Sequence, residues 1–207
     1  MDTRLRIGRA IGKNEEEVSI ELMSQIKARG NPDLPPAMAS DGNDSYPEAM
    51  LATWGRVPDY SGRGRPPTRK VPEPGWKFIQ VVKHRSSHRL TGITYKVVFG
   101  DTKEVCDLMG IHTAYVERSN LTSRQMNGRM VRKTLSFSKK VVMLKASCAW
   151  EDAVYNLARP LKTLRVEVKD RNRRWLQRSP AMAAGLTDHV WKIEELLRTV
   201  IAPIPST

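Results

Sequence analysis

The sequence predicts an α/β protein in which a mixed β-sheet is flanked by helices. Apolar runs of strand length alternate with segments of helical periodicity along the first half of the chain. Parallel strands need crossover helices, and this alternation supplies them. A basic stretch rich in glycine and proline interrupts the pattern, and segments of helical spacing follow it. We therefore expect an α/β core with a basic insertion and C-terminal helices.

Net charge is the strongest global signal. The 207 residues are enough for one domain with appendages or for two small domains, and a 40% hydrophobic content allows a normal core. Thirty-five Lys and Arg residues face 22 Asp and Glu residues, which gives a formal net charge of +13. Such an excess attracts polyanions, of which DNA and RNA are the commonest. The alternative is a ribosome-associated or merely basic protein.

Cysteine usage and hydropathy argue against several classes of protein. Cys106 and Cys148 form no CxxC pair and stand at no metal-ligand spacing from the histidines. We interpret them as reduced structural thiols, which predicts a cytoplasmic protein. No apolar run reaches about 18 residues, so no membrane span is expected. The N-terminal residues also lack the apolar region of a signal peptide.

The first predicted elements are a strand and a helix. Residues 5–11 alternate apolar with basic or small side chains, which predicts a strand. Asn14 then suits a helix N-cap, because three glutamates follow in the first turn, where the helix dipole favours acids. Apolar residues at helical spacing continue to Gly30, which is typical of a helix end.

A short buried strand is predicted next, and it ends in an acid. Residues 37–40 are small or apolar, and Asp41-Gly42 follows at once. A second helix is predicted over residues 46–54, with Pro47 tolerated in its first turn.

Residues 55–75 break every periodicity with glycine and proline, and they add several cations. The cations are Arg56, Arg63, Arg65, Arg69 and Lys70. A solvated linker and an arm that contacts phosphates explain this composition equally well.

A β-hairpin and a short helix are predicted after the insertion. Residues 78–82 and 93–99 are β-rich, and a polar turn over residues 84–89 separates them. The histidines of this turn are interpreted as turn residues, since the sequence shows no Ser/His/Asp or Cys/His order that would make them catalytic. Thr102 is expected to cap a helix over residues 104–109.

Longer helices are predicted in the second half. The first covers residues 115–135, where Glu117, Leu121, Arg124 and Gly128 fall on one face. An apolar helix over residues 141–157 follows and ends at Arg159-Pro160. Residues 165–178 are expected to be basic and irregular, and residues 187–199 to form a last amphipathic helix.

Two acids stand where phosphodiester chemistry would need them. Two divalent cations about 3.5–4 Å apart can activate the attacking oxygen and stabilise the leaving one, and Mg²⁺ is held by a few carboxylates. Asp41 is placed at a strand end, where ligands gather in α/β sheets, and Glu117 lies in the first turn of a basic helix. By spacing alone, Asp41 also suits an ordinary turn and Glu117 also suits dipole compensation. The residues by themselves therefore indicate nucleic-acid binding more strongly than catalysis.

Two segments carry a resemblance to a known family. These are YVERSNLTSRQ at 115–125, continued by NGR at 127–129 and RKTLSFSK at 132–139, and SDG at 40–42 followed by YPEA at 46–49. In this order they resemble the third and second acid regions of bacterial insertion-sequence DDE transposases, nearest to the InsB-like group. The resemblance covers about residues 3–160.

The resemblance implies an RNase H-like fold, a triad of acids, two Mg²⁺ ions and transposon-end DNA as substrate. It makes Asp41 the second acid and Glu117 the third, so that both are the expected catalytic and metal-binding residues. Arg124 matches the basic residue that follows the glutamate in that family. The expected DNA-binding residues are Arg118, Asn120, Arg124, Arg129, Arg132 and Lys133.

One departure shapes the expected organisation. In that fold the first acid lies on the first strand, whereas this sequence begins at what resembles the third strand, and Asp2 is a poor candidate for the missing ligand. We expect a chain that lacks the N-terminal portion and is inactive alone, with a homo-oligomer or an upstream-encoded chain as possible partner. Residues 1–160 are expected to form the partial core, with the insertion and hairpin at 55–100, and residues 161–207 a basic extension ending in a helix.

Two other functions compete with the transposase reading. A non-catalytic DNA-binding protein would need only the basic helices. An RNA-binding protein of ribosomal type would need base-stacking aromatic side chains. Only 6% of the residues are aromatic and the tryptophans are scattered, so the RNA reading ranks last.

Overall fold

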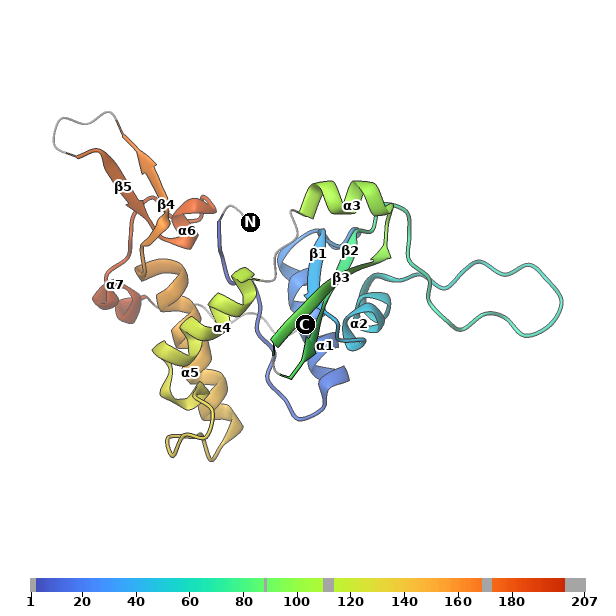
Figure 1. Cartoon of the computed structure of the whole chain (residues 1–207), viewed down its shortest axis with the longest axis horizontal. Coiled ribbons are helices and arrows are strands. Elements are labelled where there is room, and N and C mark those ends of the chain that lie inside the picture. Colours follow the sequence, from blue (N-terminus) through green and yellow to red (C-terminus); the bar gives the residue numbers. More distant parts are fainter. Residues whose placement is uncertain (1–2, 88, 110–113, 169–172, 200–207) are drawn as a thin grey trace. The chain divides into compact units, whose positions relative to one another are not determined.

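The computed structural model describes residues 3–87, 89–109, 114–168 and 173–199 (Figure 1). The chain divides into two compact units. The sheet unit is Ile7–Leu121, and the helical unit combines Met1–Arg6 with Thr122–Thr207.

A mixed three-stranded sheet organises the sheet unit, with strand order β1-β2-β3. Strand β1 runs parallel to β2, and β2 pairs antiparallel with β3. The strands are β1 (Met38–Asp41), β2 (Phe78–Ser86) and β3 (Arg89–Phe99), and the helices are α1 (Glu15–Arg29), α2 (Ser45–Trp54) and α3 (Thr102–Met109). The predicted α/β class, with a mixed sheet flanked by helices, is confirmed.

The core of this unit lies between the sheet and the first two helices. Met23 of α1, Met50 and Trp54 of α2, and Trp76 and Phe78 at the start of β2 form one buried cluster. Phe99 of β3 packs against it, with its ring edge-on to Trp76 at a centroid distance of 5.3 Å. Aromatic and methionine side chains therefore join all the elements that surround β1.

The hairpin expected within the insertion forms two of the three strands of the sheet, β2 and β3. Strand β2 pairs with both neighbours, and Phe78, Ile79 and Val81 are buried. Its pairing with β3 continues to Ser86 opposite Arg89, so the predicted polar turn over 84–89 is wrong in length. The ladder outlasts the apolar pattern because pairing of backbone groups does not depend on side-chain polarity.

Residues 57–70 form an arm between α2 and β2, as the glycine and proline content predicts. Arg56 and Val71 pair at its base through two backbone hydrogen bonds, of 3.1 and 2.9 Å. Within the sheet unit the arm extends well beyond α2 (Figure 1).

The predicted strand over residues 5–11 is wrong. Side-chain amides take the place of a neighbouring strand there. In the helical unit, Arg6 N–H donates to Asn156 Oδ1 at 3.0 Å and Asn156 Nδ2 donates to the Arg6 carbonyl at 2.9 Å. In the sheet unit, Gln25 exchanges the same two bonds with Arg9, both at 3.1 Å. The extended backbone is thus satisfied without a sheet.

The helical unit contains α4 from Thr122 on, α5, two short helices and a β-ribbon. Its elements are α4 (Ala114–Met126), α5 (Val141–Ala153) with a π-helical continuation (Val154–Ala158), β4 (Leu161–Glu167), β5 (Trp175–Arg178), α6 (Pro180–Ala183) and α7 (Ile193–Arg198). The predicted helix over 141–157 is confirmed.

Three expectations for this half are corrected. The helix predicted over 115–135 ends at Met126, because Asn127 takes an extended backbone and caps a short 3-10 turn, Gly128–Met130, with its side chain. Residues 165–178 contribute to the antiparallel β4–β5 ribbon. The last helix begins only at Ile193, since Trp191 N–H donates to the Leu157 carbonyl instead of to a helical turn.

The expected domain boundary near residue 160 lies inside the helical unit. It stays a prediction, since a domain is defined by its ability to fold alone. Among the described residues, no helix combines the length and apolarity needed to cross a membrane.

Replacing Met50 tests the core of the sheet unit. Met50 is 0% exposed, so Met50→Ala should lower the free energy of opening by about 2–5 kcal/mol through the lost contacts and the cavity. Native-state amide exchange of the β2 residues measures it. Leu90→Ala, at a residue 54% exposed, is the control and should change it by less than about 0.5 kcal/mol; equal effects would contradict the described core.

Candidate functional site

Asp41 is the last residue of β1, and it is exposed. It lies opposite Val81 in the parallel pairing with β2. The turn that follows runs close to β2, because a Cβ placed on Gly42 would lie 3.0 Å from a methyl carbon of Val82. Glycine after Asp41 therefore lets the chain leave the sheet directly, and the carboxylate remains at the strand end.

Asn43 fixes the turn between β1 and α2. Its Oδ1 accepts from the Ser45 N–H at 2.8 Å, which satisfies a free donor at the start of α2. The buried Gln80 donates from Nε2 to the Asn43 carbonyl at 2.8 Å, and the Asn43 amide donates to the carboxylate of Glu15. This network connects α1, β2 and the turn behind Asp41.

The pKa of Tyr46 is affected by the negative charge at this strand end. Burial raises the pKa of its phenol above the usual value, and the carboxylates of Asp41 and Glu15 raise this pKa further. Two acids thus act on one side chain, although they come from different elements. We call Glu15, Asp41, Asn43 and Tyr46 the strand-end cluster. Its carboxylate and amide oxygens are ligands that Mg²⁺ prefers.

The strand-end cluster contains two carboxylates, those of Glu15 and Asp41. In the part of the chain that the structure describes, no group of three or more His, Cys, Asp or Glu side chains is placed to hold a metal ion. Glu117 belongs to α4, but its side chain lies outside the described residues. The convergence of Asp41 and Glu117 therefore stays a prediction, as do their catalytic roles.

The expected DNA-binding residues lie on α4 and on the segment after it. Five are exposed, and Arg124 is half-buried. The exposed ones are Arg118, Asn120, Arg129, Arg132 and Lys133. The Arg129 guanidinium donates to Ser138 Oγ at 2.9 Å, which ties it to the following loop. Contact of these residues with DNA stays a prediction.

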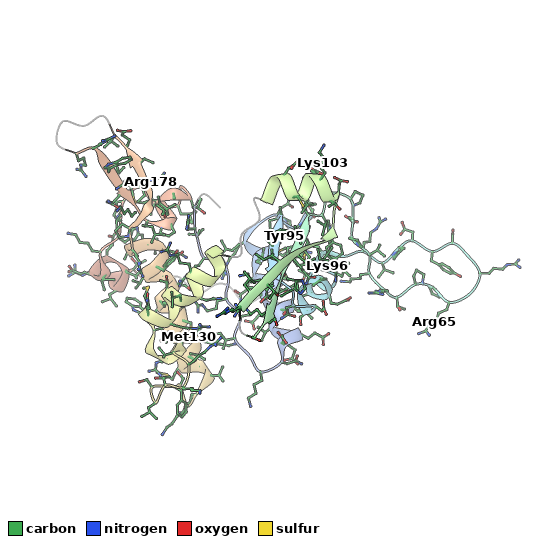
Figure 2. All side chains as sticks on the ribbon, in the orientation of Figure 1. Arg65, Tyr95, Lys96, Lys103, Met130 and Arg178 are labelled. Carbon is green, nitrogen blue, oxygen red and sulfur yellow. The ribbon has the colours of Figure 1, made fainter. Side chains whose placement is uncertain are left out.

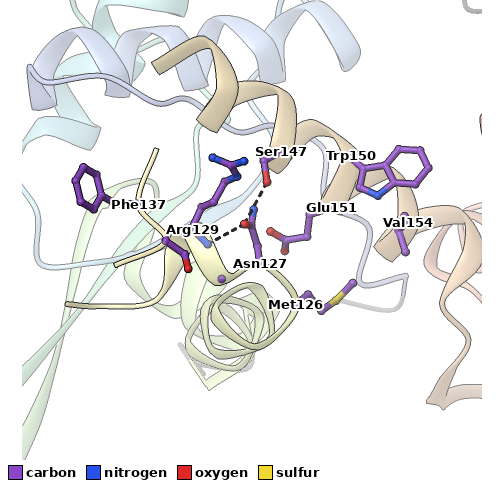
Figure 3. A pocket seen from close by; sticks show the side chains of 10 residues that line it. Met126, Asn127, Arg129, Phe137, Ser147, Trp150, Glu151 and Val154 are labelled. Atoms are coloured by element: carbon purple, nitrogen blue, oxygen red, sulfur yellow. Dashed lines mark hydrogen bonds between the residues drawn. The ribbon is translucent and has the colours of Figure 1, made fainter. Parts of the chain in front are cut away.

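A cavity of about 520 Å³ in the helical unit was not expected (Figure 3). It forms where α4 ends. The buried Asn127 connects two of its walls, because its Oδ1 accepts from Arg129 N–H and from Ser147 Oγ, both at 3.1 Å. Phe137 and Trp150 line it and are partly exposed. The Asn127-Gly128 pair, a common helix breaker, was the sequence signal for this change of direction.

Sequence reasoning also missed the part that Glu15 plays. It interpreted Glu15 as compensation of the helix dipole, and the residue does lie in the first turn of α1. Only the folded chain shows that this turn reaches Asn43 and acts on Tyr46.

No family model matches the chain, and neither does any curated protein or solved structure. A functional assignment therefore depends on the residues themselves.

Removing the Asp41 charge tests the geometry of the strand-end cluster. Asp41→Asn should lower the pKa of Tyr46, because a nearby negative charge disfavours the phenolate. That pKa should remain above the value of an exposed tyrosine, since burial is the larger cause. A pH titration of ¹³Cζ-labelled tyrosine by NMR, assigned with Tyr46→Phe, measures it. An unchanged Tyr46 pKa would contradict the proximity.

Proposed function

We propose that the chain acts in DNA transposition as the part of a DDE transposase that carries the second and third acids, in an enzyme that cleaves and joins strands at transposon ends. The observation that carries this proposal is the order of two motifs. Asp41 stands at an exposed strand end, and the long segment from Tyr115 to Lys139, which resembles the last-acid region of insertion-sequence transposases, follows it.

The mixed sheet supports an RNase H-like core. A parallel β1–β2 pair beside an antiparallel β2–β3 hairpin combines both strand directions in one sheet. Helices α1 and α2 pack on it, and Asp41 ends the parallel strand. The acid thus lies where open α/β sheets bind their ligands.

Each residue has a defined task in this proposal. Asp41 offers a carboxylate to Mg²⁺ at a position that DNA can reach, and Glu117 supplies a second one. Bound Mg²⁺ would activate the attacking oxygen and stabilise the leaving oxygen. The phenol of Tyr46 is neutral at physiological pH, as that of an ordinary tyrosine is, and burial with two nearby carboxylates raises its pKa further, so it adds no charge against phosphate. Exposed arginines and lysines after α4 neutralise the DNA backbone.

The second candidate is a non-catalytic DNA-binding protein. The net charge of +13 supports it without any role for the acids. The two functions differ in whether Asp41 and Glu117 bind a metal.

Metal binding separates the two candidates without requiring a complete triad. With duplex DNA present, Asp41→Asn and Glu117→Gln should each weaken Mn²⁺ binding by at least about tenfold, because each removes a charged oxygen ligand. Electron paramagnetic resonance of free Mn²⁺ gives the affinities. DNA affinity should stay the same or rise slightly in both variants.

Asp107→Asn, on the exposed side of α3, is the control for a general loss of negative charge and should leave Mn²⁺ binding unchanged. Wild-type Mn²⁺ affinity in both Asp41→Asn and Glu117→Gln would favour the non-catalytic protein.

Charge removal after α4 tests the DNA interface. The affinity for duplex DNA should fall steeply with salt, and Arg132→Gln combined with Lys133→Gln should make the slope of log K against log salt shallower by about 1–2, because fewer counterions are released. Fluorescence anisotropy at several salt concentrations measures the slope. A slope equal to that of the wild type would remove Arg132 and Lys133 from the interface.

A further inference from the structure

The arm of residues 57–70 is anchored at its base. Lys70 Nζ donates to the Ala52 carbonyl near the end of α2 at 2.6 Å, and Arg69 pairs with Glu48 of α2 at 3.3 Å. Arg56 pairs with Glu73 across the base at 3.5 Å. The cations at the base are thus engaged with the sheet unit itself.

The tip differs from the base. Arg63 and Arg65 are exposed, and neither has a hydrogen bond or an ion pair with any residue that the structure describes. Arg65 lies near the outer end of the arm, away from the helices (Figure 2). Gly64, between them, has a φ of +113°, which disfavours any side chain at this position. Two guanidinium groups therefore remain available to a ligand.

The two prolines that follow the tip favour an extended chain there. Pro66 and Pro67 fix φ and carry no N–H, and the residue before a proline is also restricted to extended backbone. The bend at Gly64 lies between the two arginines and directly precedes this stiff segment.

The narrow minor groove of A·T-rich DNA fits such a tip. It concentrates negative potential and attracts arginine, whose guanidinium is less strongly hydrated than an ammonium group. G·C pairs project an amino group into this groove, whereas A·T pairs present only acceptors there. Gly64 has no side chain to hold the backbone away from the groove floor.

We propose that Arg63-Gly64-Arg65-Pro66 inserts into the minor groove of A·T-rich duplex DNA, with the anchored base holding the arm to the sheet unit. The inference rests on the proposed function in that its partner is DNA, but it requires neither the metal nor the acids. It makes the arm a source of sequence preference, which phosphate contacts alone do not provide.

Three duplexes of equal length, with a central A·T, G·C or inosine·C tract, test the inference. Inosine lacks the guanine amino group. The inosine·C tract therefore keeps the hydrogen-bonding groups of G·C in the major groove, but no amino group projects into its minor groove. By fluorescence anisotropy, the full chain should bind the A·T and inosine·C duplexes about tenfold more tightly than the G·C duplex. Arg63→Ala combined with Arg65→Ala should abolish this preference, and Gly64→Ala, which keeps the charge, should reduce it.

Lys96→Gln combined with Lys103→Gln removes two exposed charges elsewhere in the sheet unit and is the matched control (Figure 2). It should lower all three affinities by the same factor. Equal wild-type affinity for the three duplexes, or a loss in the double arginine variant that is the same for all three, would overturn the proposal. Neither result would change the Mn²⁺ affinities that test the transposase function, so failure of one proposal is distinguishable from failure of the other.

Discussion

The parallel pairing of β1 with β2 is the constraint on which the sheet unit depends. Strand β1 has only four residues, and it is held because β2 also pairs with β3 and buries Phe78 and Ile79. Aromatic and methionine side chains from α1, α2 and β2 fill the space beside it. Because β1 is so short, its register with β2 places Asp41 at the end of the strand. Helix α2 then begins at Ser45, only four residues later.

The charges around this strand end define its chemical character. Asp41 and Glu15 act on the same phenol in a chain whose net charge is +13. Two carboxylates would repel a phosphodiester unless a cation lay between them, and the exposed arginines and lysines elsewhere attract the same polyanion. Under the proposed function, the basic surfaces bring DNA to the protein while a metal ion makes the acidic strand end compatible with it. The arm adds base preference to this otherwise sequence-independent attraction.

The sequence predicted most local signals and few non-local ones, although Asp101 caps α3 by accepting from the Lys103 and Glu104 N–H groups, and the expected cap Thr102 lies inside the helix. Asn14 caps α1 through the Glu16 N–H, and Asp41 ends a strand, because capping and strand ends are encoded by neighbouring residues. The prediction of a strand over residues 5–11 was wrong because the side-chain amides of Asn156 and Gln25 form the hydrogen bonds of this extended backbone. No local sequence pattern shows partners so distant. The β4–β5 ribbon was missed because its basic side chains also pack: Arg165 stacks on Trp175 with its guanidinium 4.2 Å from the ring centroid. For the strand-end cluster, the sequence predicted Asp41 as a site residue. It did not predict that Glu15 and Tyr46 lie near Asp41, because only folding brings them together.

The central claim is that folding carries the carboxylates of Asp41 and Glu117 to one metal ion beside DNA. Fe²⁺ substituted for Mg²⁺ reduces added hydrogen peroxide to hydroxide and a hydroxyl radical, with ascorbate regenerating Fe²⁺ from Fe³⁺, and the radicals cut the polypeptide backbone close to the ion. With duplex DNA present, mass spectrometry of the fragments should show cuts around residue 41 and around residue 117, and both should disappear in Asp41→Asn. Cuts at one of these places alone, or at neither, would contradict the account.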